Sequence, residues 1–116
     1  MAEFSFPKSA RLRKRPEFLG LDKCGRRIKN ALFIAVYHKS RGPVSRLGIT
    51  VTRKVGPAHV RNRIKRHIRE FFRQNRSRLK ENNDIHIIAK RQAAGAVFTS
   101  ARGALRDIFE KMASHA

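Results

Sequence analysis

The chain has 116 residues, which is enough for one domain and too few for two. It carries 28 Lys and Arg against 8 Asp and Glu, and the formal net charge of +20 predicts a nucleic acid or an anionic membrane surface as partner. A hydrophobic fraction of 41% excludes a disordered basic tail, and the single cysteine, Cys24, excludes an internal disulfide. No apolar run approaches the ~20 residues of a membrane span, and the first residues lack the apolar core of a secretory signal, so we expect a cytoplasmic protein.

The N-terminal segment predicts a basic arm followed by a short helix. Residues 1–15 show little periodicity and form an extended basic arm in this interpretation. Pro16 suits the first turn of a helix, and Gly25 is a suitable C-terminal cap for it.

Two apolar segments rich in β-branched and aromatic residues predict strands. Residues 31–37 (ALFIAVY) form the first and residues 46–52 (RLGITVT) the second. The turn residues SRGP (40–43) between them predict that the second strand runs antiparallel to the first through that turn. A further short strand before Asn30 also fits the pattern.

The second half of the chain predicts two helices around one strand. Gly56 and Pro57 lead into a basic helix over 60–73, extending to 76 at most, and residues 84–90 form a third strand after it. The strands over 46–52 and 84–90 with this helix form a β-α-β crossover, which is usually right-handed. After a loop at 93–95, Thr99 or Ser100 caps a last helix. Its buried positions are predicted to be Leu105, Ile108, Phe109 and Met112.

The basic helix (RNRIKRHIREFFR, residues 61–73) separates its side chains into two opposed faces at about 100° per residue. The apolar face consists of Val60, Ile64, Ile68 and Phe71. The opposite face consists of Asn62, Lys65, Arg66, Arg69 and Arg73, with Arg61 and Arg63 on the flanks. Such closely spaced cations repel one another, and a polyanion removes that cost. The alternative is a solvated face, but solvated helices usually interleave both signs of charge.

The residue types that carry catalysis form no recognisable constellation. No two carboxylates are placed as a general acid and base, and the five histidines show no metal-ligand spacing with one another or with Cys24. We therefore predict no catalytic residue and no metal held by a protein motif.

The RNRIKR motif, followed by Arg69 and preceded by TVTRKVGPAHV, resembles the protein subunit of bacterial ribonuclease P. With RLRKRPEF and DIHIIAK the resemblance covers residues 6–112. It implies a single RNA-binding domain over 1–116 with an α/β (α+β) two-layer sandwich, similar to ribosomal-protein domains, in the order α-β-β-(β)-α-β-α with a left-handed β-α-β crossover. It also implies a subunit that assists a catalytic RNA in removing the 5′ leader of precursor tRNA. The RNA and its magnesium ions carry out the hydrolysis.

The resemblance also assigns roles to particular residues. The basic helix, residues 60–76, and its neighbours would bind RNA through Arg61, Asn62, Arg63, Lys65, Arg66, Arg69, Arg73, Arg53, Lys54, Arg11 and Arg13. The leader groove would include Phe18, Ile34 and Val36. The chain departs from some relatives in having Asp22 where they have a second aromatic residue. A tyrosine of one relative aligns with Val36 although Tyr37 is adjacent, so either parity of this strand fits.

Two other functions are compatible with the same composition. A structural ribosomal protein binding ribosomal RNA is the main alternative, and a peripheral protein on anionic lipid is the weaker one because the apolar side of the basic helix is needed for the core. In every case we expect anions such as sulfate or phosphate to occupy the basic sites.

Overall fold

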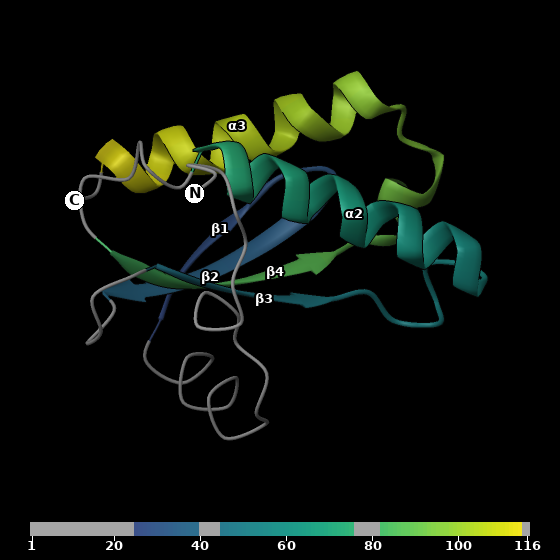
Figure 1. Cartoon of the computed structure of the whole chain (residues 1–116), viewed down its shortest axis with the longest axis horizontal. Coiled ribbons are helices and arrows are strands. Elements are labelled where there is room, and N and C mark those ends of the chain that lie inside the picture. Colours follow the sequence, from purple (N-terminus) through teal and green to yellow (C-terminus); the bar gives the residue numbers. More distant parts are fainter. Residues whose placement is uncertain (1–24, 40–44, 76–81, 115–116) are drawn as a thin grey trace, which may run out of the picture.

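The computed structural model describes residues 25–39, 45–75 and 82–114, which form one four-stranded sheet with two long helices on one of its faces (Figure 1). The predicted basic arm, and the predicted first helix apart from Gly25, lie outside the described residues. The elements in chain order are β1 (Arg26–Lys29), β2 (Phe33–Lys39), β3 (Arg46–Thr50), α2 (Ala58–Asn75), β4 (Asn83–Ala89), the 3₁₀ helix η3 (Arg91–Gly95) and α3 (Phe98–Ser114).

The strands are ordered β1-β2-β4-β3, so the predicted hairpin between the strands over 31–37 and 46–52, here β2 and β3, does not form. β2 and β3 run in opposite directions, but β4 lies between them, antiparallel to β2 and parallel to β3. The reason is visible in β4 itself, where Ile85, His86 and Ile87 are consecutive and all buried. Because consecutive residues point to opposite faces, such a strand needs cover on both faces and takes a central position.

The β3-α2-β4 unit is the predicted β-α-β crossover between parallel neighbours. Figure 1 shows both strand arrows pointing right, β3 in front of β4, and α2 above the sheet. This arrangement is left-handed, as the resemblance implied, and it corrects the right-handed default.

The turn between β1 and β2 explains why the apolar run begins two residues before its strand. The Asn30 Oδ1 accepts the backbone N–H groups of Leu32 (3.0 Å) and Phe33 (2.9 Å), so residues 30–32 form a side-chain-stabilised turn. The Asn30 Nδ2 also donates to the Ala104 carbonyl at 3.0 Å. One asparagine therefore ends the predicted short strand, starts β2 at Phe33 and ties the turn to α3.

The core lies between the sheet and the two helices. β2 presents Phe33, Ala35 and Tyr37 to it, and alternation places Ile34 and Val36 on the other face of the sheet. The four predicted core residues of α3 are all buried, and Phe109 meets Phe71 edge-to-face with ring centroids 5.1 Å apart.

The junction between β4 and α3 differs from its prediction. The loop expected at 93–95 is part of η3, and α3 already begins at Phe98. The N–H of Ala101 donates to the Val97 carbonyl at 3.0 Å, which places the first helical hydrogen bond before the expected caps. Thr99 and Ser100 therefore lie inside the first turn and do not cap the helix.

Candidate nucleic-acid interface

Helix α2 is buried on its apolar face and exposed on its basic face, as predicted. Ile64, Ile68 and Phe71 are buried, Val60 is half-buried, and Phe72 adds a further buried ring. On the opposite side Asn62, Arg63, Arg66 and Arg69 are exposed, while Arg61, Lys65 and Arg73 are half-buried. We call the cations Arg61, Arg63, Lys65, Arg66 and Arg69 the cationic ridge.

The start of α2 holds its first arginine in place. Pro57 provides the carbonyl that accepts the N–H groups of Val60 and Arg61, each at 3.1 Å. A Cβ on Gly56 would come within 3.3 Å of the Val60 Cγ1, so this residue allows a close approach to the first helical turn. The Arg61 Nε donates to the Gly56 carbonyl at 3.1 Å. That bond uses one of five guanidinium donors and leaves the positive charge uncompensated.

Arg63 is positioned by a segment that lies far away in the sequence. Its Nη2 donates to the Ala94 carbonyl of η3 at 2.9 Å. The partner is a neutral carbonyl, so this contact also orients a guanidinium without neutralising it. Both arginines of the R-N-R motif are thus fixed by backbone oxygens and keep donors for an anion.

The carboxylates in the described part of the chain do not neutralise the cationic ridge. Among the residues that the structure describes, Arg63, Arg66 and Arg69 form no ion pair with a carboxylate. Glu70 pairs with Arg73 at 2.6 Å, beyond the ridge, and this hydrogen bond lowers the pKa of the Glu70 carboxyl. The ridge therefore remains a concentrated positive surface to which a polyanion can bind.

The pKa of His67 is affected by burial and by the positive charge of this surface. Its pKa lies below its ordinary value because burial disfavours the charged ring and because Arg63 and Arg66 repel it. The folded state binds this proton less tightly than the unfolded chain, so the contribution of His67 to stability is present above about pH 6.5 and falls as the pH decreases.

We expect RNA to raise the pKa of His67. Phosphates bound beside Arg63 and Arg66 attract the charged form of the His67 ring and so offset the repulsion by the two arginines. The other charged groups near the ring, Glu70 on the same helix and Arg102 on α3, are the same with and without RNA. Binding then takes up a proton, so RNA affinity increases as the pH falls through the range in which His67 titrates, near its ordinary value of 6.5. An NMR titration of the imidazole with and without RNA measures the shift, and a His67→Gln variant should lose part of the pH dependence. An unchanged pKa in the complex would place the phosphates elsewhere.

Further cations meet at the sheet edge where α2 begins. Arg53 and Lys54 are exposed in the turn after β3, as the prediction of RNA contact requires. The sequence reasoning missed Lys90 and Arg91, which follow β4. Because β3 and β4 are parallel neighbours, their C-terminal ends meet at one edge, and the crossover pattern could have revealed this.

The strand predicted to line the leader groove presents alternate residues to the two faces of the sheet. Val36 pairs with Arg27 and His86, and Ile34 pairs with Lys29 and Ile88, so both point away from the helices. Tyr37 is buried on the helix side. Val36 is 0% exposed, whereas Ile34 is half-buried and is the one with accessible surface. Phe18, Arg11 and Arg13 lie outside the described residues.

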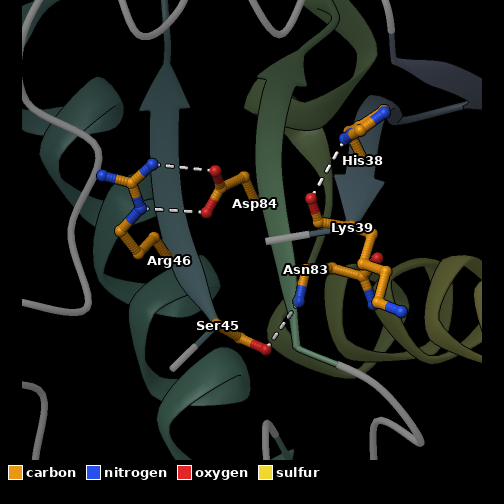
Figure 2. Close-up of polar contacts among 6 residues, drawn as sticks. All are labelled: His38, Lys39, Ser45, Arg46, Asn83 and Asp84. Atoms are coloured by element: carbon orange, nitrogen blue, oxygen red, sulfur yellow. Dashed lines mark hydrogen bonds and ion pairs between the residues drawn. The ribbon is translucent and has the colours of Figure 1, made fainter. Parts of the chain in front are cut away.

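The same outer face of the sheet carries polar contacts. The Thr50 Oγ1 and His86 Nε2 lie 2.6 Å apart, joining β3 to β4. At the other end of these strands the Arg46 guanidinium forks onto Asp84, with the Nε at 2.9 Å and the Nη2 at 2.8 Å (Figure 2). Arg46 therefore links β3 to β4.

Two more hydrogen bonds secure the ends of the central strands (Figure 2). The Asn83 N–H donates to the Ser45 Oγ at 2.9 Å, which fixes the start of β4 against β3. The His38 Nδ1 lies 3.0 Å from the Lys39 carbonyl at the end of β2. The bond between Asn83 and Ser45, together with the fork between Arg46 and Asp84, holds the register of the parallel pair on which the crossover depends.

The described carboxylates do not fit a magnesium site. Magnesium requires several oxygen ligands in octahedral geometry. Asp84 is bound to Arg46, Glu70 to Arg73 and Asp107 to Lys111. Within the described ranges no three His, Cys, Asp or Glu side chains gather as metal ligands. No helix in those ranges combines the length and apolarity needed to cross a bilayer.

Comparison with known proteins agrees with this geometry. A family profile described as Ribonuclease P matches residues 6–113. The "Ribonuclease P protein component" of Desulfatibacillum aliphaticivorans is 58% identical over 91 residues, covering 78% of this chain and 77% of the relative. That of Desulfosudis oleivorans is 45% identical over 111 residues, covering 96% and 92%.

Solved structures show the same fold. The Staphylococcus aureus RNase P protein superposes with a TM-score of 0.84 at 31% identity, covering 89% of this chain and 94% of that one. The RNase P protein from Thermotoga maritima gives 0.79 at 34% identity, covering 87% and 96%. The profile match over residues 6–113 includes the four strands, the cationic ridge and all but the last residue of α3. The chain belongs to the ribonuclease P protein family.

Proposed function

We propose that this chain binds the catalytic RNA of ribonuclease P through the cationic ridge and assists the endonucleolytic removal of the 5′ leader from precursor tRNA in the cytoplasm. The observation that carries the proposal is the row of Arg63, Arg66 and Arg69, exposed on α2 and without carboxylate partners among the described residues. Arginine forks two hydrogen bonds onto a phosphate, and the regular spacing of a helix suits repeated contacts along a folded RNA.

The proposal divides the labour between protein and RNA. The RNA and the magnesium ions that it holds carry out hydrolysis, and the protein contributes positive charge and shape. The carboxylates in the described part of the chain are tied to Arg or Lys side chains or stand alone, which supports a binding role for the protein. The magnesium ions therefore belong to the RNA in this proposal.

The substrate leader is proposed to bind on the outer face of the sheet. Ile34 offers accessible apolar surface there, Val36 forms a buried floor, and Phe18 is the proposed aromatic partner. Lys29 and Arg27 are exposed on the neighbouring strand and point to the same face, where they can meet the phosphates of a single strand.

Reconstitution tests this division of labour. Highly purified protein alone should leave precursor tRNA intact, and the protein added to ribonuclease P RNA at low magnesium should restore cleavage at the mature 5′ end. Cleavage by the protein without RNA, or no effect of the protein on the RNA-catalysed reaction, would contradict the proposal.

The ribosomal alternative is not favoured by the comparisons, since the matching relatives are described as ribonuclease P components. The RNA that co-purifies with the protein separates the two functions. One specific non-ribosomal RNA is expected, and recovery of ribosomal particles instead would support the alternative.

Free anions should stabilise the protein in the absence of RNA. A net charge of +20 destabilises the compact state through self-repulsion, and sulfate or phosphate bound to the native ridge opposes this. We expect the melting temperature to rise with added phosphate at constant ionic strength, and to rise less in an Arg63→Ala/Arg66→Ala variant. Equal melting temperatures in phosphate and chloride would show that the ridge holds no anion.

A further inference from the structure

A cleft of about 200 Å³ lies between α2 and α3, beside the cationic ridge. It is lined by His67, Glu70, Phe71 and Gln74 of α2 and by Arg102 of α3. Ordinary small-molecule pockets measure about 300–1,000 Å³, so this cleft suits a single ring system. His67 at its edge lies in the field of Arg63 and Arg66, so an anionic group attached to such a ring would be attracted to the same place.

Arg102 provides a planar surface in this cleft. Its Cζ lies 5.8 Å from the centroid of the Phe71 ring, and its Nη1 lies 3.4 Å from the Gln74 Oε1. The Phe71 ring is itself fixed edge-to-face against Phe109. The guanidinium is thus held between a buried ring and the cleft, which is the arrangement in which arginine stacks on a nucleobase.

Glu70 gives the cleft a hydrogen-bonding preference. It is the sole carboxylate of α2, and its Oε2 accepts a hydrogen bond from Arg73 at 2.6 Å, which lowers its pKa and keeps it ionised. The remaining lone pairs of its two oxygens can only accept further hydrogen bonds. Beside an RNA surface a carboxylate repels phosphates, whereas it suits a base edge that carries two neighbouring donors. Guanine presents such a pair, the N1–H and the exocyclic amine, on its Watson–Crick edge.

We propose that the cleft between α2 and α3 binds one unpaired guanine of the partner RNA, stacked on Arg102 and bound through its Watson–Crick edge to Glu70. The phosphate of that nucleotide lies toward Arg63 and Arg66. This inference rests on the proposed RNA-binding function and adds a base-specific contact to a ridge that otherwise meets phosphates, which carry no sequence information.

Titration of the folded, isotope-labelled protein with GMP, AMP and CMP tests the proposal by NMR. We expect GMP to shift the signals of His67, Gln74 and Arg102 and to bind about 10-fold more tightly than AMP or CMP. Glu70→Gln should remove most of this preference. Arg102→Ala should weaken GMP binding about 5- to 10-fold, and Arg102→Lys, which keeps the charge and loses the plane, should weaken it similarly.

Arg106→Ala is the matched control, because Arg106 is exposed on the same helix and does not line the cleft. It should leave GMP binding within about 2-fold of the parent protein. Equal responses to the three nucleotides, or shifts confined to Arg63 and Arg66, would overturn the guanine site. The proposed function is judged separately by assembly with ribonuclease P RNA, so normal assembly without a GMP preference would overturn the cleft proposal alone.

Discussion

Replacing Arg63 and Arg66 together with alanine should weaken assembly with ribonuclease P RNA by about 30- to 150-fold. The two guanidinium groups are exposed and form no carboxylate pair among the described residues, so each is available for a phosphate. A charge-assisted hydrogen bond at an exposed site contributes about 1–1.5 kcal/mol, and two of them give this range. Filter binding or calorimetry at fixed magnesium measures the loss, and the salt dependence of binding should become shallower.

The control removes two charges from a different face. Arg106 and Lys111 are exposed on α3, and the pair between Lys111 and Asp107 is a surface pair of little energetic value. The Arg106→Ala/Lys111→Ala variant has the same net charge as the Arg63→Ala/Arg66→Ala variant. If both variants lost affinity equally, net charge would explain binding and the ridge would have no special role.

Replacing Ile68 with alanine should lower the free energy of unfolding by about 2–4 kcal/mol. Its side chain is 1% exposed beneath the ridge, so truncation removes apolar contacts and leaves a cavity. In a domain of this size the melting temperature should fall by about 10 °C. Chemical denaturation followed by circular dichroism gives both quantities.

Arg69, the next residue, is the comparison for that experiment. It is exposed, and Arg69→Ala should change stability by less than about 0.5 kcal/mol while reducing RNA affinity. Comparison of the two variants thus separates the packing of α2 against the core, through Ile68, from the binding of RNA, through Arg69. A stable Ile68→Ala protein would mean that α2 is held in place by something other than its apolar face.

The sequence predicts the helices better than the sheet. The apolar spacing of α2 and α3 identifies their buried residues because each helix packs through one continuous face. The order of the strands depends on which strand is covered on both sides, and the turn residues at 40–43 wrongly favour a hairpin. In the structure three consecutive residues of β4, Ile85, His86 and Ile87, are buried, but the polar His86 between two isoleucines hides this in the sequence.

Only the part of the candidate site that lies on one helix could be predicted from the sequence. Periodicity places Arg63 and Arg66 on the basic face of one helix. It cannot show that η3 provides the carbonyl that orients Arg63, because that contact depends on how the segment after β4 packs against α2. The cleft beside Arg102 likewise requires the packing of two helices that are far apart in the sequence.

Directed cleavage of the RNA from the ridge tests the central claim most directly. An iron chelate that generates hydroxyl radicals can be attached at Asn62→Cys, in a Cys24→Ser background, and compared with the same chelate at Arg106→Cys. Asn62 is exposed in the middle of the R-N-R motif, whereas Arg106 is exposed on α3. We predict strong, localised cuts in ribonuclease P RNA from position 62. Cuts of equal strength from position 106, or none from position 62, would contradict binding through the ridge.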